Sequence, residues 1–238
     1  MLNIQEYNLL EKAHLFACLC KMCYLSDESL EIECKKYNFP QPINIKCDNA
    51  HCLVFFFHND IVVAIQGTND KQDVKADLNL FFSDTNVEDG YVHSGFLCES
   101  QKIADALPSF QVDKRNLWFC GHSLGAAIAT ILLSKFFPKQ LFTFGSPRVG
   151  NKVWVDAYSN ITHHRFVNNN DIVCRIPNIN YWHHGQEHYI NYYGDVLDSP
   201  SYFRKMADRA RSHLRALAKL QKFDSLYDHS INQYINKL

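Results

Sequence analysis

The chain has no long hydrophobic run and almost no net charge. No apolar stretch in its 238 residues approaches the length of about 20 residues that a bilayer-spanning helix needs. The first residues, Met1 to Tyr7, lack the basic region and apolar segment of a secretory signal peptide. A formal net charge of -1 gives no indication of nucleic-acid binding. We therefore expect no transmembrane segment, no nucleic-acid partner, and a cytoplasmic protein or one exported without a cleaved signal peptide.

A disulfide framework is missing as well. The nine cysteines are an odd number, and several of them lie in apolar runs, which favours a reducing compartment. Cys18, Cys20 and Cys23 suggest a zinc site as one alternative, but their spacing falls in a helical pattern and does not bring them to one face. We expect buried free thiols, no metal and no cofactor.

Strands and helices alternate along the chain. With 47% hydrophobic residues, 1–238 is expected to form a single domain. The patterns predict strands at 52–57, 61–65, 117–120, 141–144 and 165–167, and helices at 6–25, 97–107, 124–136, 150–158 and 200–222. This alternation predicts an α/β fold with a central, mostly parallel sheet and helices on both faces.

The most specific motif runs from Gly121 to Gly125 and reads Gly-His-Ser-Leu-Gly. An apolar strand leads into it and a helix-forming run follows it. A serine on such a sharp strand-to-helix turn needs small neighbours, which Gly121 and Gly125 supply beside His122, and its hydroxyl is left exposed. Ser123 is therefore predicted to be a nucleophile at a nucleophile elbow.

Several further segments occur in the order found in a known family. They are 65–68 (IQGT), 91–96 (YVHSGF), 121–125 (GHSLG), 144–151 (FGSPRVGN), 170–177 (NDIVCRIP) and Asp228-His229. On these motifs the chain resembles the class 3 lipases of the α/β-hydrolase fold. The resemblance implies a carboxylic ester hydrolase that acts on a lipid or small ester substrate, of the triacylglycerol lipase or phospholipase A type.

A serine nucleophile requires a base and an acid, which follow it in the order acid, histidine in α/β-hydrolases. Asp171 is the preferred acid, because it follows the strand at 165–167 and matches the family's acid position. Asp156 and Asp195 are weaker candidates. His229 is the preferred base, because it lies after the last strand and matches the family's Asp-His pair.

Of the other downstream histidines, His184 also lies in a family segment, but we expect it to be structural. The oxyanion hole is expected to use the backbone N–H of Leu124, the residue after the nucleophile. By family resemblance, Thr68 supplies the second N–H. Two departures from the family pattern, Gln66 for a common arginine and Cys174 for a common proline, are not expected to impair catalysis.

Two segments bear on the substrate. In the family, residues 69–82 correspond to a lid, and here the first half of that segment is charged and lacks tryptophan. We expect modest activation at lipid interfaces and a preference for phospholipid or shorter, more soluble esters over triglyceride. The predicted helix at 200–222 has an apolar face and a basic face, which fits either peripheral contact with a membrane surface or packing on the core.

Two other functions stay open. A thioesterase or an enzyme that deacylates lipidated proteins would use the same triad and oxyanion hole, because both serve every acyl ester. A lipase-like fold with a dead site would act as a binding module, although every position of the predicted triad holds a residue type that is competent for catalysis.

Overall fold

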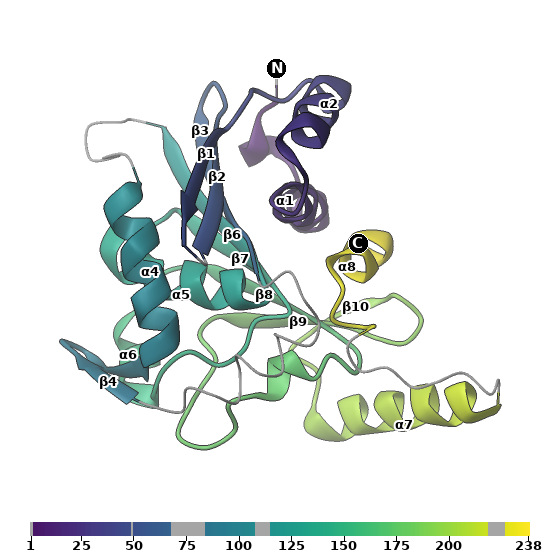
Figure 1. The fold of residues 1–238 in the computed structure, drawn as a ribbon. Coiled ribbons are helices and arrows are strands. Elements are labelled where there is room, and N and C mark those ends of the chain that lie inside the picture. The colour runs from purple at the N-terminus through teal and green to yellow at the C-terminus, as the bar shows by residue number, and fades with distance from the viewer. Residues whose placement is uncertain (1, 49, 68–83, 108–114, 219–226) are drawn as a thin grey trace.

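A sheet of eight strands, covered by helices, organises the chain (Figure 1). The computed structural model describes residues 2–48, 50–67, 84–107, 115–218 and 227–238. The strand order in the sheet is β1 (Ile43–Cys47), β2 (Ala50–Phe56), β3 (Asp60–Ile65), β6 (Asn116–His122), β7 (Gln140–Phe144), β8 (His163–Asn168), β9 (Gln186–Ile190) and β10 (Val196–Asp198). A separate two-stranded sheet pairs β4 (Asp84–Val87) with β5 (Gly90–His93).

Strands β3, β6, β7, β8 and β9 run parallel, and the antiparallel pairings lie at the two edges of the sheet. The predicted mostly parallel sheet is therefore confirmed. Parallel neighbours need long crossovers, and helices supply several of them. The helices are α1 (Leu9–Met22), α2 (Asp27–Tyr37), α4 (Ser94–Ala106), α5 (Leu124–Phe136), α6 (Lys152–Ala157), α7 (Tyr202–Ala218) and α8 (Ile231–Lys237).

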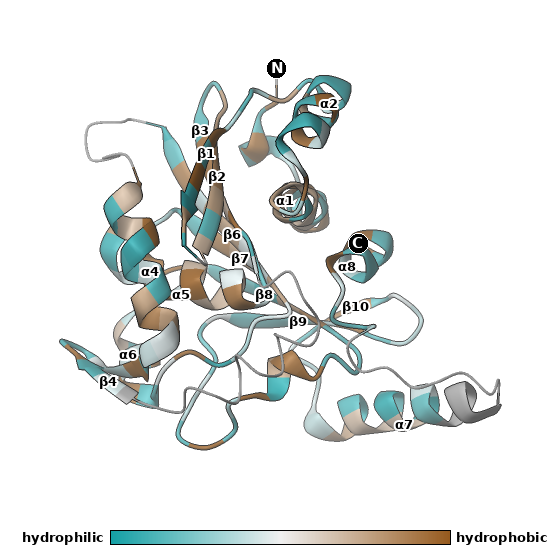
Figure 2. Cartoon of the chain, viewed as in Figure 1, coloured by the Kyte–Doolittle hydropathy of each residue, from teal (hydrophilic) through white to brown (hydrophobic). Residues whose placement is uncertain are grey.

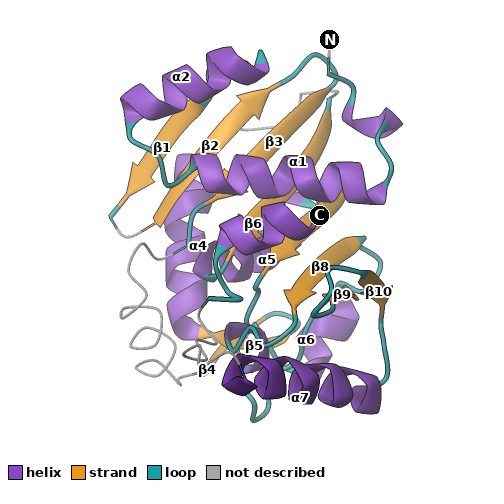
Figure 3. Cartoon of the chain, turned by 90° about the vertical axis from the view of Figure 1, so that its right-hand side faces the viewer, coloured by secondary structure: helices purple, strands orange, loops and turns teal. Residues whose placement is uncertain are grey.

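Each face of the sheet has its own hydrophobic cluster, because successive side chains of a strand point to opposite faces. On β6, Phe119 joins the cluster that contains residues of α4, α5 and α6. Its neighbours Trp118 and Cys120 join the cluster that contains residues of α1, α2 and α8. Figure 3 shows α1 lying across one face with α4 and α5 behind the sheet, and Figure 2 shows hydrophobic residues on α5 and on the strands that it covers. The predicted coverage of both faces is therefore observed.

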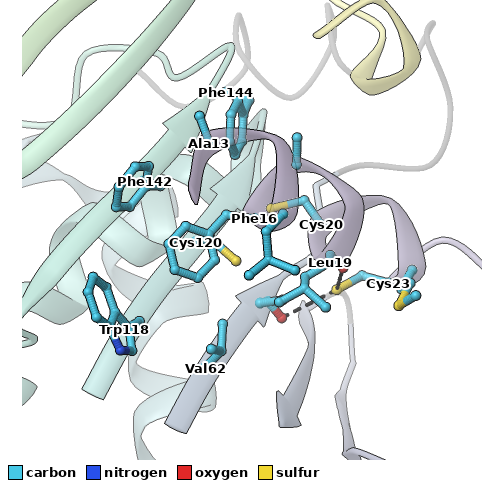
Figure 4. Packing of buried hydrophobic residues seen from close by; sticks show 14 of the residues in the cluster. Ala13, Phe16, Leu19, Cys20, Cys23, Val62, Trp118, Cys120, Phe142 and Phe144 are labelled. Carbon is cyan, nitrogen blue, oxygen red and sulfur yellow. Dashed lines mark hydrogen bonds between the residues drawn. The ribbon is translucent and has the colours of Figure 1, made fainter. Parts of the chain in front are cut away.

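Helix α1 begins at a capping box and packs on the sheet through Phe16. The Asn8 side chain accepts hydrogen bonds from the backbone N–H groups of Leu10 and Glu11, and the Glu11 carboxylate accepts one from the N–H of Asn8. About two turns further on, the fully buried ring of Phe16 lies 5.8 Å from the ring of Trp118 and 4.7 Å from that of Phe142 (Figure 4). This contact fixes α1 over the centre of the sheet.

Thiols fill part of the same layer. Cys20, Cys23 and Cys120 are buried in the cluster beneath α1, and the Cys23 thiol donates to the carbonyl oxygen of Ala64 at 3.3 Å (Figure 4). All nine cysteines are unpaired. Within the described ranges, no group of three or more His, Cys, Asp and Glu side chains is arranged to hold a metal ion. In those same ranges, no helix combines the length and the apolar composition needed to cross a bilayer.

The structure contains elements that the sequence patterns did not predict. Helix α2 is mostly polar and buries only Leu30 and Cys34, so its apolar stripe is too narrow to predict it. The edge strands β1 and β10 are half-buried or exposed, and hydrogen bonds to β2 and β9 determine their conformation. The helix predicted at 200–222 begins at Tyr202, and its end from residue 219 on lies outside the described residues.

The aromatic contact beneath α1 generates a stability prediction. Phe16→Ala removes a fully buried ring between α1 and the sheet and should lower the free energy of unfolding by about 3–5 kcal/mol. Urea denaturation followed by circular dichroism measures the loss. Leu10→Ala, on the same helix but with a side chain that is 40% exposed, is the control and should cost less than about 1 kcal/mol. Equal losses in both variants would contradict this account of how α1 is held.

Candidate active site

Ser123 occupies a strained turn between β6 and α5. Its backbone angles are φ 60° and ψ -126°, a region that side-chain-bearing residues rarely adopt. The turn is held by a hydrogen bond of 3.0 Å from the Ser123 N–H to the carbonyl oxygen of Phe144. Gly121 and Gly125 are needed for close approach, since a Cβ atom at Gly121 would strike the backbone of Gly125, and one at Gly125 would strike that of Ile65. The backbone makes a sharp strand-to-helix turn at Ser123, but the expectation of an exposed hydroxyl is wrong: the residue is 2% exposed, with the His229 ring against its hydroxyl.

The fold brings Asp171 and His229 to this serine from distant parts of the chain. The His229 Nε2 atom lies 2.8 Å from Ser123 Oγ, and its Nδ1 atom lies 2.9 Å from Asp171 Oδ2 and 3.0 Å from Oδ1. An ionised carboxylate only accepts hydrogen bonds, so Nδ1 carries the proton and Nε2 is free to accept from the serine hydroxyl. All three side chains are buried.

Asp171 is satisfied by donors from three segments. Besides His229, the Tyr234 hydroxyl of α8 donates to Oδ2 at 2.6 Å, and the Val173 N–H donates to Oδ1 at 2.9 Å. Burial by itself raises the pKa of this carboxyl, but the charge of a protonated His229 and hydrogen bonds from His229 and Tyr234 outweigh burial and lower the pKa. Burial and the adjacent carboxylate raise the pKa of Tyr234, which keeps its proton as the donor.

His122, the residue before the serine, links three parts of the site. Its Nε2–H donates to the backbone carbonyl oxygen of His229 at 2.7 Å, so its Nδ1 accepts from the Tyr24 hydroxyl at 2.9 Å. The same hydroxyl oxygen accepts from the Gly67 N–H at 2.9 Å. Burial, together with the charge of a protonated His229, lowers the pKa of His122 from 6.5 to about 3, which keeps the ring neutral.

The backbone carbonyl groups of Asp228 and His229 both accept hydrogen bonds from other parts of the site. The Asn168 side chain, at the end of β8, donates from Nδ2 to the carbonyl oxygen of Asp228 at 2.8 Å. His122 holds the next carbonyl, that of His229 itself. Lys237 of α8 in turn donates to Asn168 Oδ1 at 2.7 Å. The imidazole is therefore held by its backbone as well as by Asp171.

Leu124 and Gly67 lie next to Ser123, where the oxyanion hole is predicted. Leu124 is the first residue of α5, and N–H groups in the first turn of a helix have no partner within the helix. Gly67, at the end of β3, lies against the serine, since a Cβ atom added there would be 2.8 Å from the Ser123 Cβ. Thr68 and the predicted lid at 69–82 lie outside the described residues.

The weaker candidates have partners elsewhere. Asp156 is exposed and pairs with Lys152 at 2.8 Å, and Asp195 accepts from Asn191 at 2.9 Å. The His184 ring lies 3.0 Å from that of His163 between their Nδ1 atoms, and its Nε2 lies 2.9 Å from the carbonyl oxygen of Tyr158. Neither contact of His184 involves Ser123, Asp171 or His229.

Tyr24 and Tyr234 were not predicted to contact the site. Tyr24 is separated from His122 by 98 residues, and no motif marks it. Tyr234 lies on the same segment as His229, five positions later, and a search of the turns after the histidine for hydroxyl donors would have found it. Both tyrosines reach their partners, His122 and Asp171, only once the chain has folded.

The neutral state of His122 predicts a pH dependence of stability. An unfolded chain protonates this histidine below pH 6.5, whereas the folded chain resists protonation down to about pH 3, so stability falls with acid in that window. His122→Gln should flatten the slope of unfolding free energy against pH by about 1.4 kcal/mol per unit between about pH 4 and pH 6. Urea titrations at several pH values measure it. His58→Gln, in the exposed turn before β3, is the control; an unchanged slope in His122→Gln would show that the folded chain protonates His122.

The Tyr234 hydroxyl predicts a second loss of stability. Tyr234→Phe keeps the ring but removes a donor to a buried carboxylate, which should lower the free energy of unfolding by about 1.5–3 kcal/mol. Tyr227→Phe removes the hydroxyl of an exposed tyrosine and should change the value by less than about 0.5 kcal/mol. If the two variants were equally stable, the Tyr234 to Asp171 hydrogen bond would contribute nothing.

Parts of the chain are similar in sequence to known proteins. The sequence model of one family, described as Lipase (class 3), matches residues 62–181, half of the chain. The toxin TseL of Vibrio cholerae is 36% identical over 97 residues, which cover 37% of this chain and 15% of TseL. The secreted mono- and diacylglycerol lipase 1 of Fusarium solani is 30% identical over 154 residues, covering 58% of this chain and 46% of that protein. This chain thus matches less than half the length of either relative.

Solved structures show the same fold. A triacylglycerol lipase described as having a serine protease triad aligns with a TM-score of 0.66 at 20% identity, covering 81% of this chain and 84% of that one. A Rhizomucor miehei lipase in complex with its propeptide aligns with a TM-score of 0.63 at 21% identity, covering 78% of this chain and 69% of that one. These similarities show the α/β-hydrolase fold. Together with the match at residues 62–181, they lead to one conclusion: the chain belongs to the class 3 lipase family.

Proposed function

We propose that the chain is a serine hydrolase that cleaves carboxylic esters of lipids through Ser123, His229 and Asp171. The observation that carries this proposal is the line of hydrogen bonds from Ser123 Oγ to His229 Nε2, at 2.8 Å, and from His229 Nδ1 to Asp171 Oδ2, at 2.9 Å. Membership of the class 3 lipases supports a lipid ester as the substrate.

The reaction proceeds through an acyl-enzyme. Ser123 Oγ bonds to the ester carbonyl carbon while His229 Nε2 takes the hydroxyl proton. The tetrahedral intermediate then breaks its bond to the alcohol oxygen, which leaves with that proton. Water then attacks the acyl carbon and gives a proton to His229 Nε2. As the bond from the acyl carbon to Ser123 Oγ breaks, His229 returns this proton to Oγ, and the fatty acid leaves. Asp171 holds the imidazole in the required tautomer and stabilises its charged form.

The negative charge on the carbonyl oxygen needs donors in place before the reaction. We assign the Leu124 N–H as one of them, because it starts α5 and follows the nucleophile. Thr68 is the second by family resemblance. The hydrogen bonds of Tyr24 with Gly67 and His122 support a fixed distance between this loop and the elbow.

The class of lipid is a finer proposal. Two relatives are named for mono- and diacylglycerols and for phospholipase A1, the second being phospholipase A1-II 1 of Oryza sativa, at 28% identity over 165 residues. The charged first half of segment 69–82 favours phospholipid or short, soluble esters over emulsified triglyceride. We also propose a reducing location, because all nine thiols are unpaired, with export without a cleaved signal as the alternative.

Release of fatty acid tests this function. Purified protein is given phospholipid, lysophospholipid, mono-, di- and triacylglycerol, and Ser123→Ala serves as the blank. We expect release from phospholipid or partial glycerides above that from emulsified long-chain triglyceride, and Asp171→Asn should lower turnover by about four orders of magnitude. Full activity in Asp171→Asn would show that another residue serves as the acid of the triad. No release from any ester above the blank would favour a thioesterase, a protein-deacylating enzyme or a binding module.

A further inference from the structure

Helix α7 is attached to the rest of the protein by its polar side. Asp208, which is buried, accepts at Oδ2 from Asn169 Nδ2 at 2.7 Å, from the Tyr189 hydroxyl at 3.0 Å and from the Tyr192 N–H at 3.0 Å. One position later, the Arg209 Nε–H donates to the carbonyl oxygen of Asn169 at 3.0 Å. Both attachments meet the segment that leads to Asp171.

A salt bridge continues this polar side toward the start of the helix. Lys205 Nζ lies 2.7 Å from Glu187 Oε1, and both side chains are largely buried. Lys205, Asp208, Arg209 and the half-buried Ser212 recur at intervals of one to four residues and share one side of the helix. The inward side of α7 is therefore polar.

The apolar side of α7 faces solvent instead of the core. Phe203 is 82% exposed and Met206 is 49% exposed, and Ala207 and Ala210 are exposed as well. An ordinary surface helix has the reverse arrangement, with its apolar stripe on the core. Figure 2 shows hydrophobic and hydrophilic residues along α7, and Figures 1 and 3 both place the helix at the lower edge of the molecule. We call Phe203, Met206, Ala207 and Ala210 the α7 apolar face.

The charge beside this face is positive. Arg204 and Arg211 are exposed, and the Arg211 guanidinium lies 5.9 Å from the ring of the exposed Tyr193. From Tyr202 to His213 the one acid is Asp208, which is buried. An apolar stripe with arginines along it and no exposed acid is typical of helices that lie in the headgroup region of an anionic bilayer.

We propose that α7 docks the protein on a surface of anionic phospholipid, with the α7 apolar face inserted among the headgroups. This inference rests on the proposed function, and it specifies that the lipid substrate is part of a membrane surface. The attachment of α7 to Asn169 holds the docked helix two residues from Asp171 in sequence. Pairing of two copies through this face is disfavoured, because it would bring Arg204 and Arg211 of one copy toward those of the other.

Vesicle sedimentation with the Ser123→Ala protein tests the docking without lipid breakdown. Vesicles of phosphatidylcholine alone are compared with vesicles in which about a third of it is replaced by phosphatidylglycerol. We expect binding to the anionic vesicles. Phe203→Ser/Met206→Ser should weaken it about tenfold or more, and Arg204→Gln/Arg211→Gln by roughly ten- to thirtyfold.

Matched substitutions away from α7 serve as controls. Phe137→Ser removes a ring that is 64% exposed at the end of α5, and Lys21→Gln/Lys46→Gln removes two exposed lysines. Both should bind as the parent does. Equal binding by the parent and both α7 variants would overturn the proposal, as would a dimer that Phe203→Ser/Met206→Ser dissociates in the absence of vesicle binding.

Activity separates this proposal from the proposed function. With Ser123 intact, the α7 variants should hydrolyse a water-soluble short-chain ester at the parent's rate and lose hydrolysis of anionic vesicles. Vesicle binding by Ser123→Ala without hydrolysis of any ester by the parent would overturn the proposed function alone. Hydrolysis of soluble esters without vesicle binding would overturn the docking proposal alone.

Discussion

The burial of the Asp171 carboxylate is the constraint on which the site depends. A buried charge is costly unless donors surround it, and here the donors come from the turn after β8, from the segment that carries His229 and from α8. Two of these donors have further contacts, since the second ring nitrogen of His229 lies 2.8 Å from Ser123 Oγ, and Tyr234 is buried in the cluster that contains α1. The interactions that compensate the buried charge therefore also bring the side chains of His229 and Ser123 together.

Much of the sheet could be predicted from the sequence, because strands such as β2 and β3 have long apolar runs. Strands β2, β3, β6, β7 and β8 were all predicted close to their observed bounds. The edge strands β1 and β10 could not be predicted, because pairing with neighbouring strands determines their conformation. Helix α2 could not be predicted either, because it buries only two residues and has little apolar pattern. Ser123, Asp171 and His229 were named from motif order, and the structure brings them within hydrogen-bonding distance. Tyr24 reaches His122 only through the packing of α1 on the sheet, which no local pattern records.

Helix α7 shows where periodicity alone is ambiguous. Its sequence has an apolar and a basic side, and the pattern by itself fits packing on the core as well as contact with a surface. The polar contacts of its inward side show its orientation: Asp208 accepts from three donors on the rest of the protein, and Arg209 and Lys205 make further contacts there. The apolar side of the helix is therefore the side that stays exposed.

The thiols beneath α1 have a practical consequence for following the motions of this protein. Cys20, Cys23 and Cys120 are buried between α1 and the sheet, and burial raises the pKa of Cys20 and Cys23, so their reactive thiolate forms are scarce. Cys98 is exposed on α4. An alkylating reagent should therefore modify Cys98 at once and the buried thiols only when α1 lifts from the sheet. The rate at which these buried thiols are alkylated would therefore report how often α1 separates from the sheet.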